Sequence, residues 1–121
     1  MGTFEHPITL TAANGESETI NGLVDTGATF STVSRSTLRR LGVTPFARIR
    51  LRLADGNSTE AEVGEVTAQI LGMPPRTIIC VFGENGAPPS IGAHALEAFL
   101  LGVDPDQKRL VPLEAWWARN A

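Results

Sequence analysis

The sequence is short of the residues that disulfide frameworks and metal sites need, with one cysteine and two histidines among 121 residues. Cys80 has no partner for a disulfide within the chain, and its place in the apolar run 77–82 predicts a buried thiol rather than a catalytic one. His6 and His94 share no metal-ligand spacing and have no cysteine nearby. We therefore expect no metal ion and no cofactor.

Long apolar runs are also missing. No stretch approaches the ~20 consecutive apolar residues that span a bilayer as a helix. The N-terminus has neither the basic start nor the apolar run of a secretory signal. We expect a chain without a membrane segment, located in the cytoplasm.

An excess of positive charge is absent as well, because the formal net charge is −3 at neutral pH. Nucleic-acid binding needs a basic face, so we expect no nucleic-acid partner. The arginines between positions 35 and 52 cluster without interleaved aromatic residues, which is typical of a solvated face. The length, with 42% hydrophobic and 19% charged residues, is typical of a globular chain, and we expect one domain over residues 1–121.

Alternating apolar and polar residues predict two hairpins. In the first, strands at 8–11 and 18–24 flank a glycine-containing turn at 13–16. In the second, strict alternation at 49–53 and a strand-like segment at 60–70 flank the turn residues 54–57. Further strands are predicted at 78–82, where a continuous apolar run suits a strand covered on both faces, and at 108–113.

Two short helices are expected between these strands. Ser34 is a suitable N-cap for a helix over 35–41, and Gly42 stands where this helix would end. A second helix is predicted over 93–101, after a loop at 83–89. Its apolar face would consist of Ala95, Leu96, Phe99 and Leu100.

The tripeptide Asp25-Thr26-Gly27 is the main candidate for chemistry. It follows the apolar pair Leu23-Val24, so a half-buried carboxylate would be presented where a strand turns into a tight loop. Alone, the tripeptide is typical of an ordinary turn, in which Asp and Gly serve the backbone geometry. Its context is more informative.

In order and spacing, the chain resembles the retropepsin-like aspartic proteases. The resemblance is carried by residues 23–29 around Asp-Thr-Gly, by the hairpin around Ala54-Asp55-Gly56, and by Ile91-Gly92 before a helix, and it spans about residues 8–112. It implies an all-β, closed-barrel fold with one or two short helices that forms a homodimer. It also implies an aspartic endopeptidase that cuts peptide or protein substrates beneath a hairpin called the flap.

The resemblance also implies roles for single residues. Asp25 would be catalytic, and Thr26 and Gly27 would support the active site. The Ile91-Gly92 segment would pass beside the catalytic loop. The residues that would contact substrate are Ala28, Thr29, Ala54, Asp55, Gly56, Asn57 and Ile91.

The presence of one Asp-Thr-Gly in the chain bears on how an active site could be assembled. Peptide hydrolysis by an aspartic protease needs a water between two carboxylates, one ionised and one protonated. Asp55, Asp104 and Asp106 lack the Thr-Gly context. The second carboxylate is therefore expected to be Asp25 of a symmetry-related chain.

Three positions depart from the retroviral pattern. Thr29 and Ala93 stand where retroviral members commonly have an Asp and an Arg that pair near the dimer contact, and Ser90 replaces an apolar residue. Because both charged partners are absent together, no buried charge is left alone. Two other functions remain open: a non-catalytic module that binds a peptide, and a domain that only dimerises.

Overall fold

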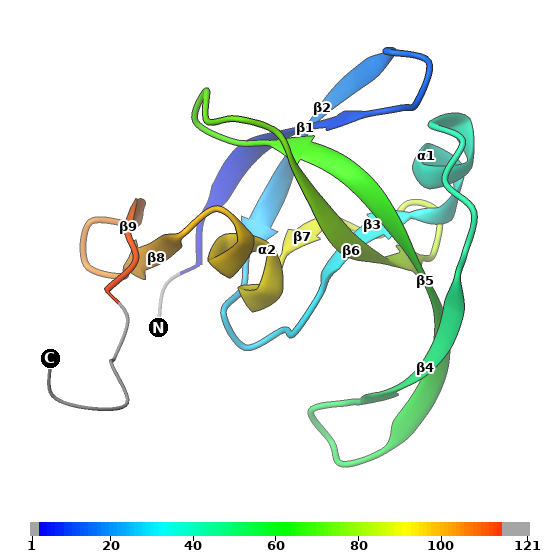
Figure 1. Ribbon diagram of the computed structural model, residues 1–121. Helices are drawn as coiled ribbons and strands as arrows, with labels where there is room; N and C mark the ends of the chain where they lie inside the picture. The colour runs from blue at the N-terminus through cyan, green and yellow to red at the C-terminus, as the bar shows by residue number, and fades with distance from the viewer. Residues whose placement is uncertain (1–2, 115–121) are drawn as a thin grey trace, which may run out of the picture.

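The computed structural model describes residues 3–114 of the chain and consists mostly of strands (Figure 1). No helix among these residues is long and apolar enough to cross a membrane. The helices are α1 (Arg35–Arg40) and α2 (Ala93–Ala98). The strands are β1 (Glu5–Thr11), β2 (Ser17–Val24), β3 (Ser31–Ser34), β4 (Ala47–Arg52), β5 (Ser58–Gln69), β6 (Arg76–Gly83), β7 (Ser90–Ile91), β8 (Leu101–Asp104) and β9 (Arg109–Pro112).

One seven-stranded sheet closes on itself. Its order is β1-β2-β7-β3-β6-β5-β4, and β1 also pairs with β5, where Thr9 lies opposite Gln69. This extra pairing closes the sheet into a barrel and leaves β4 as an edge strand. The strands β8 and β9 form a separate two-stranded sheet, on the side of the barrel away from β4 (Figure 1). The predicted all-β, closed-barrel fold with short helices is confirmed.

Both predicted hairpins form, at turns that contain a glycine with positive φ. Gly15 (φ +90°) lies between β1 and β2, and Gly56 (φ +88°) lies between β4 and β5. Glycine adopts this conformation without steric cost. Residues 58–62 of β5 pair only with β4, since the pairing of β5 with β6 begins at Val63. The β4–β5 hairpin therefore extends beyond the barrel (Figure 1).

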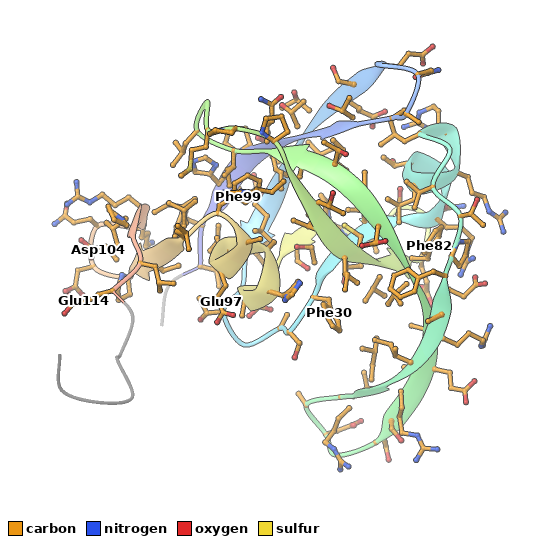
Figure 2. All side chains as sticks on the ribbon, in the orientation of Figure 1. Phe30, Phe82, Glu97, Phe99, Asp104 and Glu114 are labelled. Atoms are coloured by element: carbon orange, nitrogen blue, oxygen red, sulfur yellow. The ribbon has the colours of Figure 1, made fainter. Side chains whose placement is uncertain are left out.

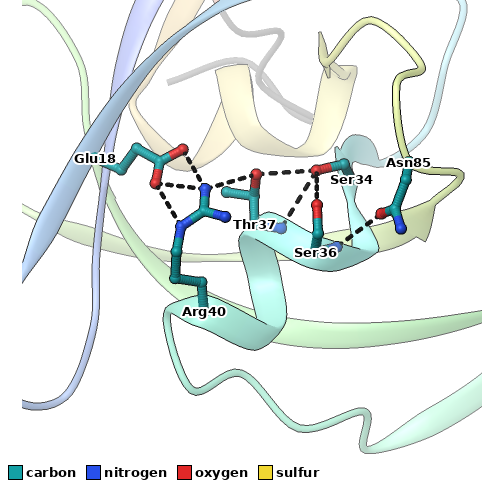
Figure 3. Close-up of polar contacts among 6 residues, drawn as sticks. All are labelled: Glu18, Ser34, Ser36, Thr37, Arg40 and Asn85. Atoms are coloured by element: carbon teal, nitrogen blue, oxygen red, sulfur yellow. Dashed lines mark hydrogen bonds and ion pairs between the residues drawn. The ribbon is translucent and has the colours of Figure 1, made fainter.

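Helix α1 begins and ends close to the predicted residues. The hydroxyl of Ser34 accepts a hydrogen bond from the Thr37 amide at 3.3 Å, as an N-cap should. Gly42 follows the helix with φ +76°. A polar network fixes α1 between β2 and the loop after β6, and Figure 3 shows its members: Glu18, Ser34, Ser36, Thr37, Arg40 and Asn85.

Helix α2 is shorter than predicted. It ends at Ala98 rather than at position 101, because the chain turns through a left-handed residue, Leu100 (φ +57°), and continues as β8. Leu96 and Phe99 are buried as expected. Leu100 is 64% exposed, so its placement on the apolar face was wrong.

Three strands were not predicted: β3, β7 and β8. They are two to four residues long, and β3 and β7 pair in parallel with β6 and β2, which are distant in sequence. Periodicity over so few residues carries little signal. The predicted strand near the C-terminus is confirmed as β9.

The core fills the barrel and continues beneath α2. Strand β6 is covered on both faces as predicted, with Ile78, Cys80, Val81 and Phe82 all buried. Cys80 has no exposed surface, and burial raises the pKa of its thiol to about 12. The predicted burial of the thiol is confirmed.

Candidate active site

Asp25 lies directly after the last residue of β2. Here β2 pairs in parallel with β7, and Val24 lies opposite Ile91. The Asp25 amide donates to the carbonyl of Ile91 at 3.0 Å, and the Leu23 amide donates to the carbonyl of Pro89 at 2.9 Å. The barrel thus fixes the backbone from which the Asp25 side chain projects.

The loop after Asp25 orients its carboxylate. The Gly27 amide donates to Asp25 Oδ1 at 3.0 Å, and the Ala28 amide donates to the Asp25 carbonyl at 3.2 Å. Asp25 is half-buried, whereas Thr26 and Gly27 are exposed. The hydrogen bond from Gly27 fixes one carboxylate oxygen, and the Asp25 side chain remains partly exposed at the surface of the chain.

The segment after β7 lies against this loop. The Ala93 amide donates to the carbonyl of Ala28 at 2.8 Å, and the His94 amide donates to the carbonyl of Thr29 at 2.9 Å. A Cβ atom on Gly92 would lie 2.6 Å from the carbonyl carbon and oxygen of Phe30, so only glycine fits. The predicted passage of Ile91-Gly92 beside the Asp25 loop is confirmed.

Two serine hydroxyls that the sequence reading did not place in the site also join these segments. Ser31 is 2% exposed, and its Oγ accepts a hydrogen bond from the Gly92 amide at 3.0 Å. Ser90 Oγ accepts from the Thr32 amide at 3.3 Å. The unusual serine before Ile91 was visible in the sequence as a departure from an apolar pattern, and the structure explains it as a link between β7 and β3.

Two hollows flank the Asp25 loop. The first, about 300 Å³, is lined by Thr3, Phe4, Val24, Asp25, Thr26, Gly27, Val103 and Pro105. The second, about 440 Å³, lies between the loop and the β4–β5 hairpin, and we call it the hairpin groove. Its lining consists of Gly27, Ala28, Thr29, Phe30, Thr32, Ile49, Arg50, Leu51, Arg52, Leu53 and Val81.

The hairpin groove contains only part of the predicted substrate-binding set. Ala28 and Thr29 line it, but the turn residues 54–57 lie outside its lining. The carboxylate of Asp55 accepts hydrogen bonds from the backbone and side-chain nitrogens of Asn57, at 2.9 and 3.1 Å, and so shapes the turn. The side chain of Ile91 is 1% exposed and lies against Gly22, so it supports the Asp25 loop from the core instead of facing the groove.

Several lining residues were missed. Ile49 and Leu51 lie on the half-buried face of β4, where the period-two alternation of the sequence could have located them. Phe30 has no such signal. Its ring packs edge-on against His94, with ring centroids 5.5 Å apart, and Figure 2 shows it between the barrel and the hairpin. This contact gives the groove an aromatic wall.

Within residues 3–114, no group of three or more His, Cys, Asp or Glu side chains is placed to bind a metal ion. The chemistry that this site offers is that of one half-buried carboxylate, which accepts an amide hydrogen bond and lines the smaller of the two hollows.

Comparison with known proteins identifies the fold. A family model described as aspartyl protease matches residues 8–104. The retroviral protease-like domain of Ddi1 from Leishmania major matches with a TM-score of 0.58 and 18% identity, over 93% of this chain and 89% of that one. A retropepsin-like aspartic protease from Rickettsia conorii matches with a TM-score of 0.51 and 20% identity, over 88% and 90%. No significant match is found among curated proteins. The retropepsin-like fold is confirmed.

Proposed function

Because the chain belongs to the aspartyl protease family, we propose that it is an aspartic endopeptidase that acts as a homodimer, with Asp25 of both chains at one active site. The observation that carries the proposal is the placement of Asp25. Its carboxylate is oriented by the Gly27 amide and lines the smaller hollow, and Gly27 also lines the hairpin groove. Thr26 and Gly27 support it.

The reaction requires two such carboxylates. One, ionised, takes a proton from a bound water while the other, protonated, donates a hydrogen bond to the carbonyl of the peptide bond. A chain with one Asp-Thr-Gly supplies one of them, so a second copy related by a twofold axis completes the pair.

Substrate would bind in the hairpin groove as an extended segment. Strand β4 is the edge of the sheet, and an edge strand offers backbone donors and acceptors to an added strand. Ala28 and Thr29 would contact the substrate from the loop side, and Ile49 and Leu51 from the hairpin side. The turn residues 54–57 are exposed, and they would reach the substrate only when the hairpin closes over it.

The alternative is a non-catalytic module that binds a peptide or only dimerises. One fold can carry several functions and can persist without catalysis, and one structural neighbour is described as a protease-like domain.

We also propose that residues 1–121 form a single domain and that the protein is located in the cytoplasm.

The test is a peptide library incubated with the purified chain across pH 3 to 8, with products identified by mass spectrometry. Asp25→Asn removes the ionisable group but keeps its shape, and we expect it to abolish cleavage. Asp106→Asn is the matched control, because Asp106 is exposed and lines neither hollow, and it should cleave the same peptides as the wild type. Equal products from the wild type and Asp25→Asn would contradict the proposed peptidase activity and favour the non-catalytic module.

A further inference from the structure

The β4–β5 hairpin, taken here as residues 47–62, has one side-chain link to the rest of the described chain. Among the hydrogen bonds and ion pairs of residues 3–114, only the pair between Arg35 and Glu62 joins a hairpin side chain to a residue outside the hairpin. The Arg35 Nη1 and Glu62 Oε1 atoms are 2.6 Å apart. The orientation of the hairpin relative to the barrel therefore depends on few contacts besides its backbone.

The ion pair lies at the base of the hairpin, where a displacement of the hairpin would begin. Glu62 is the residue before Val63, at which β5 starts to pair with β6. Arg35 is the first residue of α1, immediately after the N-cap Ser34. The ion pair thus joins the base of the hairpin to the start of a helix that is itself fixed by the polar network of Figure 3.

Arg35 is held on a second side by an aromatic ring. Its guanidinium carbon lies 5.6 Å from the centroid of Phe82, a residue of β6 that is 5% exposed. Figure 2 shows Phe82 on the side of the barrel from which the hairpin extends. The hydrogen bond from Arg35 also lowers the pKa of Glu62, and the charges of Arg35, Arg48 and Arg39 act in the same direction. Glu62 therefore stays ionised at neutral pH.

A second ion pair in the hairpin provides a comparison. Arg48 and Glu60 are 3.5 Å apart, both side chains are more than 60% exposed, and both belong to the hairpin. This pair can stabilise the hairpin internally but cannot fix its position. The side chains of Arg35 and Glu62 are 35% and 28% exposed, so solvent screens them less.

We propose that the Arg35–Glu62 ion pair sets the position of the β4–β5 hairpin over the hairpin groove. Ile49 and Leu51 line the groove from the hairpin side, whereas Ala28 and Thr29 line it from the loop. A hairpin that tilts at its base changes the distance between these two walls. Arg35 and Glu62 are therefore positioning residues for whatever the groove binds, and the proposal rests on the proposed function only in taking that occupant to be a peptide.

The experiment is a charge-reversal cycle. Arg35→Glu and Glu62→Arg each place like charges together, and the double variant restores an opposite pair in reversed order. Hairpin motion is measured by backbone ¹⁵N relaxation, with relaxation dispersion for the slower movements, at residues 47–58. The amides of the β1–β2 turn serve as an internal reference. KM and kcat are measured with a peptide that the wild type cleaves.

We expect each single reversal to raise the ratio of displaced to undisplaced hairpin by about two- to fivefold, because a partly exposed pair contributes modestly. KM should rise in inverse proportion to the undisplaced fraction. We expect kcat to change less than KM, since the reacting groups are untouched. The double variant should return the hairpin population and KM most of the way to their wild-type values. Glu60→Gln, which breaks the pair with Arg48 but leaves the Arg48 charge opposite Glu62, should leave the hairpin population and KM unchanged.

The outcomes separate this inference from the proposed function. Unchanged hairpin relaxation in the single variants, or a double variant no closer to wild type than the singles, would overturn the inference even if peptides are cleaved. If no peptide is cleaved, the relaxation measurement still decides it. If a reversal prevents folding, Glu62→Gln replaces it, and its hairpin motion must exceed that of wild type for the inference to stand.

Discussion

Gly92 is the residue around Asp25 with the least room for a side chain. An added Cβ would lie 2.6 Å from backbone atoms of Phe30 and 2.9 Å from the carbonyl oxygen of Ala28. Backbone atoms cannot rotate aside as the end of a flexible side chain can. The absence of a side chain at Gly92 is therefore what lets β7 and α2 approach the loop that carries Asp25.

We predict that Gly92→Ala destabilises the fold by about 2 kcal/mol or more, because the methyl group forces the loop and the segment apart. Urea unfolding measures the effect. Gly102→Ala is the matched control, since its Cβ would meet only Leu113 at 3.8 Å, an ordinary contact. We expect the control to lie within about 0.5 kcal/mol of wild type. Equal midpoints for the two variants would contradict this account of Gly92.

Among the elements, the two helices end in the same way with different residues. Gly42 (φ +76°) follows α1 and Leu100 (φ +57°) follows α2, each two residues after the last helical one. A left-handed conformation costs a residue with a side chain roughly 1–2 kcal/mol, whereas glycine adopts it freely. The end of α2 therefore carries local strain that the end of α1 avoids.

We predict that Leu100→Gly stabilises the chain by about 0.5 kcal/mol or more. The relieved strain exceeds the entropy that glycine loses on folding, and the 64% exposed side chain of Leu100 contributes little burial. Thermal unfolding measures the shift. Gly42→Ala, the reverse change at the end of α1, should lower the unfolding temperature. A lower unfolding temperature for Leu100→Gly would show that its side chain is needed.

The elements that could be predicted are those defined by neighbouring residues. Both hairpins are indicated by alternating apolar and polar residues around a glycine-containing turn, and α1 is indicated by Ser34 and Gly42. The strands β3 and β7 were missed because they exist through parallel partners that lie far along the chain. The end of α2 was missed because nothing in its apolar spacing marks a left-handed Leu100.

The same division applies to the site. Asp25 and its contact with the segment after β7 could be predicted from a motif and its spacing. The walls of the hairpin groove could not, because they depend on which face of β4 turns toward the loop and on how Phe30 packs. Those directions are fixed by the closure of the whole barrel rather than by any local pattern.

For the whole molecule, the proposed function makes activity a property of two chains. If dimers form at random from equal amounts of wild-type and Asp25→Asn chains, about half of the wild-type chains find an inactive partner. We predict that pre-equilibrated equal mixing lowers the activity per wild-type chain to about half, measured as peptide cleavage. Mixing with Asp106→Asn should not lower it. Activity that is independent of the added inactive chain would show that one chain suffices.

The buried Cys80 has a practical consequence for such experiments. It is the only cysteine of the chain, it has no exposed surface, and the pKa of its thiol is raised to about 12. The thiolate is the nucleophile that attacks maleimides and thiol-directed spin labels, so a buried thiol with a raised pKa should leave the native protein unlabelled. A cysteine introduced at Asn57, in the exposed turn of the hairpin, would take up a probe alone. The distance between the two hairpin tips of a dimer could then be recorded without altering the core.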